Sequence, residues 1–146
     1  MGLFDKVLGK KEEGPLTLNP REAFAAVAVA AVAADGVIEQ SELQRLVGDL
    51  AEKKMFRNSN DLGNTLNKVA SLIQKRGAGP VVKAAGKALS GELKPTAFAM
   101  ATDLLLADGE VDQEERKFLE DFQKTLGIDD ATAMKIVEVM AIKNRG

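Results

Sequence analysis

The stretch NPREAFAAVAVAAVAADG, residues 19–36, decides which fold the chain can adopt. Asn19 is a favoured N-cap residue and Pro20 suits the first helical position, so together they predict the start of a helix. An uninterrupted apolar run, Ala23 to Ala34, follows, and Gly36 is the stop signal. The run is shorter than the roughly 18–20 residues that a membrane-spanning helix needs. Its small side chains permit close approach of neighbouring backbones, so we expect the central helix of a bundle.

Outward from this helix, apolar residues keep helical spacing along the rest of the chain. Further helices are predicted over residues 39–55, 59–75, 80–90, 95–107, 112–127 and 129–141. Ser59, Asp112 and Asp129 are the expected N-caps, Pro80 and Pro95 the expected first residues, and Gly127 an expected stop. In the last helix Met134, Val137 and Ala141 form the apolar stripe. No segment alternates with a period of two, so the predicted fold class is all-α.

Composition limits the chemistry that the chain can perform. The 146 residues include no Cys and no His, which removes thiolate nucleophiles, thiolate metal ligands and the commonest general base. Metal ligands must therefore be oxygen atoms, which favours a hard cation such as calcium over zinc. No side chain stands out as a nucleophile or base, so we expect that the protein is not an enzyme.

Charge is unevenly distributed although the formal net charge is only −2. Residues 66–94 hold six basic residues and one acid, whereas residues 103–122 hold eight acids and two basic residues. The molecule should therefore have a basic and an acidic side. The basic stretch has no aromatic residue for base stacking, so no nucleic-acid partner is expected.

An internal repeat emerges when each residue is set beside the one 73 positions later. Residues 34–42, ADGVIEQSE, then fall on residues 107–115, ADGEVDQEE. Each copy follows an apolar helix opened by proline and precedes an amphipathic helix with a matching leucine, Leu46 or Leu119. The sequence thus predicts two helix–acidic turn–helix units, which we expect to lie near each other in a pseudo-twofold arrangement.

The spacing of acids in each copy equals the second half of an EF-hand loop. In the second copy Asp108, Asp112 and Glu115 match loop positions five, nine and twelve, and the carbonyl of Glu110 matches position seven. The first half of the loop is missing, because alanine or leucine stands where its first two carboxylates should be. A cation site here would be weak, on the order of 10⁻⁴–10⁻³ M.

A plainer interpretation gives the same residues a purely structural role. The aspartates can make Asx turns beside glycine, and Asp112 with Glu115 can form a capping box at a helix start. One observation disfavours this structural interpretation. Asp35 and Asp108 lie at predicted helix C-termini, where the helix dipole disfavours an anion by about 0.3–1 kcal/mol. A bound cation would compensate, and we keep both interpretations.

The two Ala-Asp-Gly turns, each with Glu at the same distance, resemble the tellurite-resistance TerB family. The opening Met1-Gly2-Leu3-Phe4-Asp5-Lys6-Val7 is similar to the start of some members. The resemblance covers roughly residues 19–50 and 95–128, and the middle of the chain matches only in being helical. It implies a compact bundle of about seven helices, a place in a tellurite or metal-stress response, and partners among other proteins of that system. The family's acidic positions would be Asp35, Glu39, Glu42, Asp108, Asp112 and Glu115, with Ser41 where the second copy has Glu114.

Residues 1–18 are predicted to be a separate N-terminal segment and linker ahead of a helical domain, residues 19–146. Leu3, Phe4, Val7 and Leu8 form one apolar stripe, flanked by lysines at positions 6, 10 and 11. Such a segment fits either a flap folded onto the core or a weak peripheral membrane contact. Without a secretory signal or spanning segment, we expect a protein of the cytoplasm or of the membrane periphery.

Two functions remain open from the sequence. The first is a non-catalytic, TerB-like metal-stress module that binds calcium or another divalent cation through its acidic turns. The second is a structural adaptor without metal, whose charged faces dock partner proteins.

Overall fold

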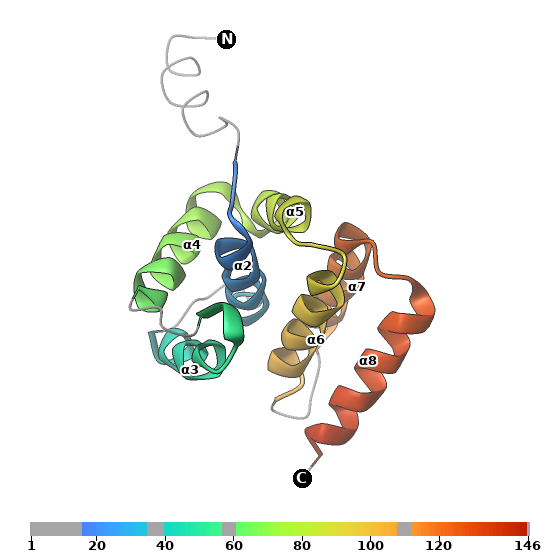
Figure 1. The fold of residues 1–146 in the computed structure, drawn as a ribbon. Coiled ribbons are helices and arrows are strands. Elements are labelled where there is room, and N and C mark those ends of the chain that lie inside the picture. Colours follow the sequence, from blue (N-terminus) through green and yellow to red (C-terminus); the bar gives the residue numbers. More distant parts are fainter. Residues whose placement is uncertain (1–15, 35–39, 57–60, 108–111, 146) are drawn as a thin grey trace.

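The computed structural model describes residues 16–34, 40–56, 61–107 and 112–145 of the chain (Figure 1). These residues form seven α-helices and one 3-10 helix, and they contain no strand. The elements are α2 Pro20–Val32, α3 Gln40–Ala51, η2 Lys54–Phe56, α4 Leu62–Arg76, α5 Ala78–Ala88, α6 Leu93–Leu105, α7 Gln113–Leu126 and α8 Asp130–Lys143. The prediction of an all-α bundle of about seven helices is confirmed.

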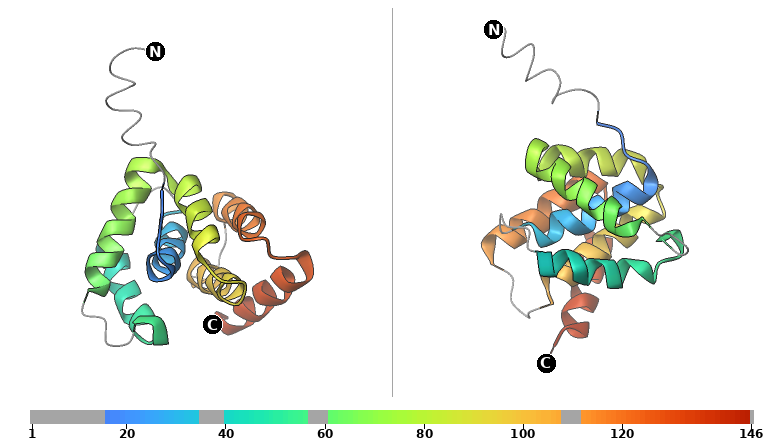
Figure 2. Two further views of the ribbon diagram at one scale, coloured as in Figure 1. Left: turned by 45° about the horizontal axis from the view of Figure 1, so that its top comes forward. Right: turned by 90° about the vertical axis from the view of Figure 1, so that its left-hand side faces the viewer.

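Helix α2 is the centre of the bundle, as its apolar run predicts. Every residue from Ala23 to Ala31 is buried, with 1% or less of its surface exposed. The helix packs against α4, α5 and α6, which surround it in the views of Figure 2. A helix that is apolar on all sides is stable only when neighbours cover all of it, so the other helices must wrap around α2.

Local signals fix where α2 begins. The Asn19 side chain accepts a hydrogen bond from the Glu22 backbone N–H at 2.8 Å, and the Glu22 carboxylate accepts one from the Asn19 N–H at 3.1 Å. This capping box satisfies helix N–H groups that have no partner within the helix. The same Glu22 carboxylate pairs with Lys68 of α4, so the cap also ties α2 to its neighbour.

The predicted helix starts are correct at most capping residues and shifted at prolines. Asn19, Asp112 and Asp129 are N-caps as expected, and Gly127 ends α7 with φ of 70°. Pro80 and Pro95, however, are the third residues of α5 and α6 rather than the first. The N–H groups of the whole first turn lack helical partners, so proline is tolerated anywhere in that turn.

Other predicted bounds differ by a few residues. Helix α2 ends at Val32 rather than Ala34, and α4 starts at Leu62, whereas the expected N-cap, Ser59, lies outside the described residues. The second predicted helix, expected to reach residue 55, ends at Ala51 and is followed by η2. Phe56 of η2 is buried and packs against Phe24 with the two rings strongly inclined and their centroids 6.4 Å apart, so packing onto α2 accounts for the break.

A second aromatic cluster joins α6 and α7. The centroid of the Phe122 ring lies 6.4 Å from that of Phe98 and 5.2 Å from that of Phe118. Thr102 is completely buried and its hydroxyl donates to the Phe98 carbonyl at 2.8 Å, so its polar group is satisfied. No helix in the described parts of the chain is long and apolar enough to cross a membrane.

The central position of α2 predicts a strong response to overpacking. We expect Ala28→Leu to lower the free energy of unfolding by about 1–3 kcal/mol, because a fully buried methyl has no room for three more carbons. Ala131→Leu, on the exposed start of α8, should stay within about 0.5 kcal/mol of the parent protein. Urea denaturation of both variants measures the difference, and equal stability of the two would contradict the central role of α2.

The cap of α2 predicts a pH-dependent contribution to stability. Hydrogen bonds from Lys68 and from the Asn19 backbone lower the pKa of Glu22 below its usual range. A carboxyl whose pKa is lower in the folded state stabilises the protein above its ordinary pKa, and this stabilisation is lost as the pH falls through the lowered value.

We therefore expect Glu22→Gln to be less stable than the parent protein near neutral pH, with the difference shrinking as the solution is acidified. Gln can still close a capping box, so the variant removes the charge and keeps the cap. Urea denaturation across the acid range gives the comparison, with Glu52→Gln as an exposed control. A Glu22→Gln deficit that does not change with pH would show that the ion pair is not its source.

Candidate functional site

The two acidic turns follow helices that end alike. Shifting the bounds of α2 by 73 residues gives the bounds of α6, and the start of α3 falls on the start of α7. The residues after these helices, Ala33 and Leu106, have φ, ψ of −93°, 6° and −90°, 1°, and each donates its N–H to equivalent carbonyls. The bounds and end geometry fit the offset of the sequence repeat, whereas its pseudo-twofold symmetry stays a prediction.

Helices α2 and α6 pack side by side and run in the same direction (Figure 1; Figure 2, right). Their C-terminal ends consequently lie at one end of the bundle. Of the predicted ligands, Asp35, Glu39, Asp108 and Glu110 lie outside the described residues. Glu42 lies in α3, and the position of its side chain is not described. Asp112 and Glu115 are the predicted ligands whose side chains lie among the described residues.

Asp112 and Glu115 form the capping box of α7. The Glu115 N–H donates to Asp112 Oδ1 at 2.7 Å, and the Asp112 N–H donates to Glu115 Oε1 at 3.1 Å. Asp112 has extended φ and ψ of −76° and 177°, which brings its carboxylate over the first turn of the helix. The structural role considered from sequence is therefore confirmed for this pair.

The Asp112–Glu115 capping box is compatible with a bound cation but does not by itself form a cation site. The donor set of the acidic turns consists of oxygens, the ligand type that hard cations such as calcium prefer. A carboxylate has two oxygens and about four lone-pair sites, so capping through one oxygen does not exhaust its acceptor capacity. Among the residues with described positions, no group of three acidic side chains is close enough together to hold a metal.

A polar groove of about 450 Å³ lies beside the end of α6. Asp103 accepts hydrogen bonds from Lys143 at 3.1 Å and from the Asn144 amide at 2.8 Å, which joins α6 to the end of α8. The groove is also lined by residues of α3 and the segment that follows it, Arg45, Asp49, Glu52 and Lys53. Sequence reasoning missed this groove, because the residues that α3, α6 and α8 bring to it are far apart in the chain and follow no motif.

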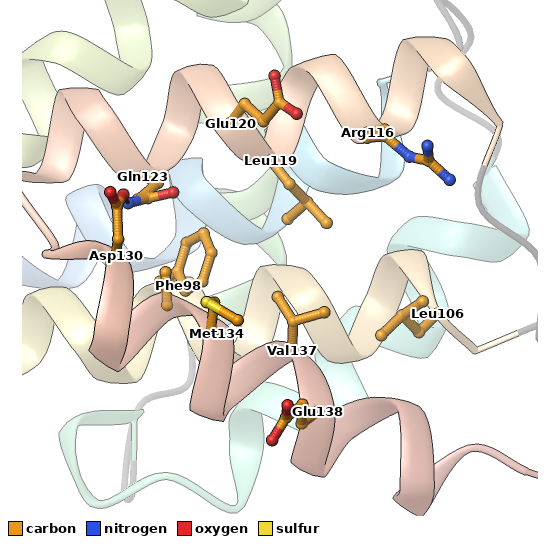
Figure 3. Close-up of a pocket in the computed structure, with 11 residues that line it drawn as sticks. Phe98, Leu106, Arg116, Leu119, Glu120, Gln123, Asp130, Met134, Val137 and Glu138 are labelled. Atoms are coloured by element: carbon orange, nitrogen blue, oxygen red, sulfur yellow. Dashed lines mark hydrogen bonds between the residues drawn. The ribbon is translucent and has the colours of Figure 1, made fainter.

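An apolar groove of about 530 Å³ lies between α7 and α8, over α6. Figure 3 shows Phe98, Leu119, Met134 and Val137 directed toward one another in this groove. Arg116, Glu120, Gln123, Asp130 and Glu138 form its polar border. Gln123 donates to Asp130 at 2.7 Å, which closes the end where α7 meets α8.

Helix α8 leaves part of its apolar stripe uncovered. Met134 is 63% exposed, and within this fully described helix Ala133 is the one buried residue. The reason is tertiary, because α8 packs mainly against α6, leaving the space toward α7 open as the groove. Helical periodicity finds an apolar face but cannot say whether another element covers it.

Comparison with known proteins gives a family match. A family model described as "Tellurite resistance protein TerB" matches residues 21–138 of the chain. No curated protein and no solved structure matches it.

The capping box predicts a specific loss of stability. Asp112→Ala should lower the free energy of unfolding by roughly 0.5–2 kcal/mol, because the first turn of α7 loses its side-chain acceptor. Asp112→Asn should remain close to the parent, since Asn caps as well as Asp. Asp121→Ala, at an exposed position of the same helix, is the control, and urea denaturation is the measurement. If Asp112→Ala and Asp121→Ala lower the free energy of unfolding equally, the cap does not contribute to stability beyond an exposed position of the same helix.

Proposed function

Because the family match spans residues 21–138, the chain belongs to the tellurite resistance protein TerB family, and we propose that it is a non-catalytic metal-stress module that binds a divalent cation. The observation that carries this proposal is the parallel packing of α2 and α6, whose matching C-terminal ends lie at one end of the bundle. In the sequence, each of these helices is followed closely by Ala-Asp-Gly.

Electrostatics supports a cation at this end of the molecule. A helix C-terminus has a partial negative charge of roughly half an elementary charge, arising from carbonyls without helical partners. Two such ends lie on the same side, and the sequence adds Asp35 after one and Asp108 after the other. Negative charges brought together in this way repel each other, and a divalent cation relieves the repulsion.

The proposed ligands are the oxygens of Asp108, Asp112 and Glu115 with the carbonyl of Glu110, while Asp35, Glu39 and Glu42 form the weaker counterpart. Calcium is the favoured ion, because it accepts six to eight oxygens in flexible geometry. The first half of an EF-hand loop is absent, so water or a neighbouring group would complete the coordination. Affinity in the range of roughly 10⁻⁴–10⁻³ M would follow, as for the weakest calcium modules.

We further propose a cytoplasmic location and partners among the other proteins of a tellurite or metal-stress system. Family membership supports this assignment, and the absence of His and Cys from the sequence favours binding over catalysis. We expect no nucleic-acid partner, because the basic stretch of residues 66–94 has no aromatic side chain.

The alternative function is a metal-free adaptor that docks other proteins. The observation that favours it is the Asp112–Glu115 capping box, which gives two of the proposed ligands a complete structural role. In this case the acidic turns join helices, and the charged surfaces make the contacts with partners.

Cation titration separates the two functions. We expect calcium at millimolar concentration to shift backbone NMR signals of residues 107–115 and to raise the melting temperature of the intact protein, since a ligand that binds only the folded state stabilises it. The variant with Asp108→Asn, Asp112→Asn and Glu115→Gln should lose both effects. These substitutions remove charge and keep side chains that can cap α7.

A matched control removes the same number of charges elsewhere in the C-terminal half. Glu120→Gln, Asp121→Asn and Glu138→Gln all change exposed side chains and should leave the calcium response intact. No response of the parent protein to millimolar calcium or magnesium would reject the cation proposal and leave the adaptor. An equal loss of the calcium response in the control variant would show that calcium binding depends only on the overall charge.

A further inference from the structure

We propose that the apolar groove between α7 and α8 is the docking site of residues 2–11 of the same molecule, held there as an amphipathic helix. This inference does not rest on the cation proposal, because it concerns an apolar surface and a different ligand, although the groove reaches Leu106 at the end of α6. It commits to one of the two roles that the sequence leaves open for the N-terminal segment.

The groove has the properties of a surface that lacks a partner. Phe98 and Leu119 form its floor, and Met134, 63% exposed, stands at its edge with Val137 (Figure 3). A large exposed apolar side chain beside an apolar cavity is a typical feature of a binding groove. Covering it would remove apolar surface from water at about 25 cal/mol per Å².

The N-terminal segment matches the groove in chemistry and length. Leu3, Phe4, Val7 and Leu8 would present one apolar stripe, the pattern by which amphipathic helices bind in grooves. A helix of ten residues is about 15 Å long. The borders of the groove, from Arg116 to Gln123 on α7 and from Asp130 to Glu138 on α8, extend for about 10–12 Å at the same rise per residue.

Charge is complementary as well. The border of the groove has three carboxylates, Glu120, Asp130 and Glu138, against the single guanidinium of Arg116. The segment has three lysines, at positions 6, 10 and 11, against Asp5. Opposite charges at the rim add little affinity but favour the correct orientation and partner.

The connection to the rest of the chain favours docking within one molecule. The described chain begins above α4 and α5, and α7 leads into α8 at the same end of the bundle on the other side of α5 (Figure 1). Residues 12–15 form the link, and four extended residues can span about 13–14 Å. A short link that spans the distance to the groove gives the segment a local concentration in the millimolar range, at which even a weak contact is occupied.

The composition of the chain permits a direct test. The sequence has no Trp and no Tyr, so Phe4→Trp introduces a single fluorophore into the proposed contact. In the full chain we expect its emission to be shifted to the blue, and its quenching by acrylamide to be several-fold weaker than for a free peptide of residues 1–12 with the same substitution.

A matched pair of variants on α8 locates the contact. Met134→Lys, added to Phe4→Trp, should restore the quenching of the free peptide, because it places a cation at the edge of the groove. Ile142→Lys is the control, since Ile142 is 61% exposed on the same helix and does not line the groove. Both positions are exposed, so neither change should affect folding, which circular dichroism will check.

Deletion of residues 1–11 provides a second readout that needs no groove variant. The largest changes in backbone NMR signals should fall at the groove, on residues 116–123 and 130–138. Changes elsewhere would overturn the proposal, as would indole emission of the intact Phe4→Trp variant that equals that of the free peptide. Protection that requires dimer formation, seen by light scattering, would assign the groove to a second copy and reject docking within one molecule. Protection seen only with anionic vesicles would assign the segment to a membrane and reject docking as well.

Discussion

Burial of α2 on all sides is the constraint on which the rest of the structure depends. A helix without a polar face cannot remain at a surface, so neighbours must cover it from every direction. Helices α4, α5 and α6 provide this cover, and the small side chains of the run Ala23–Ala31 let their backbones come close. Interiors are packed as densely as organic crystals, and a core of alanine and valine therefore leaves little tolerance for larger groups. The capping box of Asn19 and Glu22, together with Lys68, holds the start of this helix in place.

The same constraint brings the C-terminal ends of α2 and α6 to one end of the described bundle. Because α6 packs along α2 in the same direction, the carbonyl ends of both helices have a common side. Each end is followed in the sequence by an aspartate that its helix dipole disfavours. Packing of the core thus places the partial negative charges of two helix C-termini on one side, where we propose that a cation binds. Asp112 and Glu115 show how such acids can serve the fold at the same time, since they cap α7 through one oxygen each.

Helix α8 is less deeply buried than the central helix α2. It is attached to α6 through packing and through the contacts of Asp103 with Lys143 and Asn144, and it leaves an apolar groove toward α7. A helix fixed on one side and open on another can serve as a docking surface without disturbing the core around α2. The groove reaches the C-terminal end of α6, because Leu106 is among the residues that line it.

The sequence by itself determined the helices, most of their caps and the central place of α2, because these depend on residues within a few positions of one another. Asn19, Asp112, Asp129 and Gly127 act on their own helix ends, and the capping pair of Asp112 and Glu115 could be predicted for that reason. Only the tertiary structure decided which apolar faces are covered and which charges meet. Periodicity could not tell that Met134 lies at an open groove, nor could any motif pair Asp103 with Asn144. Those outcomes depend on how helices distant in the chain pack around α2, and packing is a property of the whole core, not of any one segment.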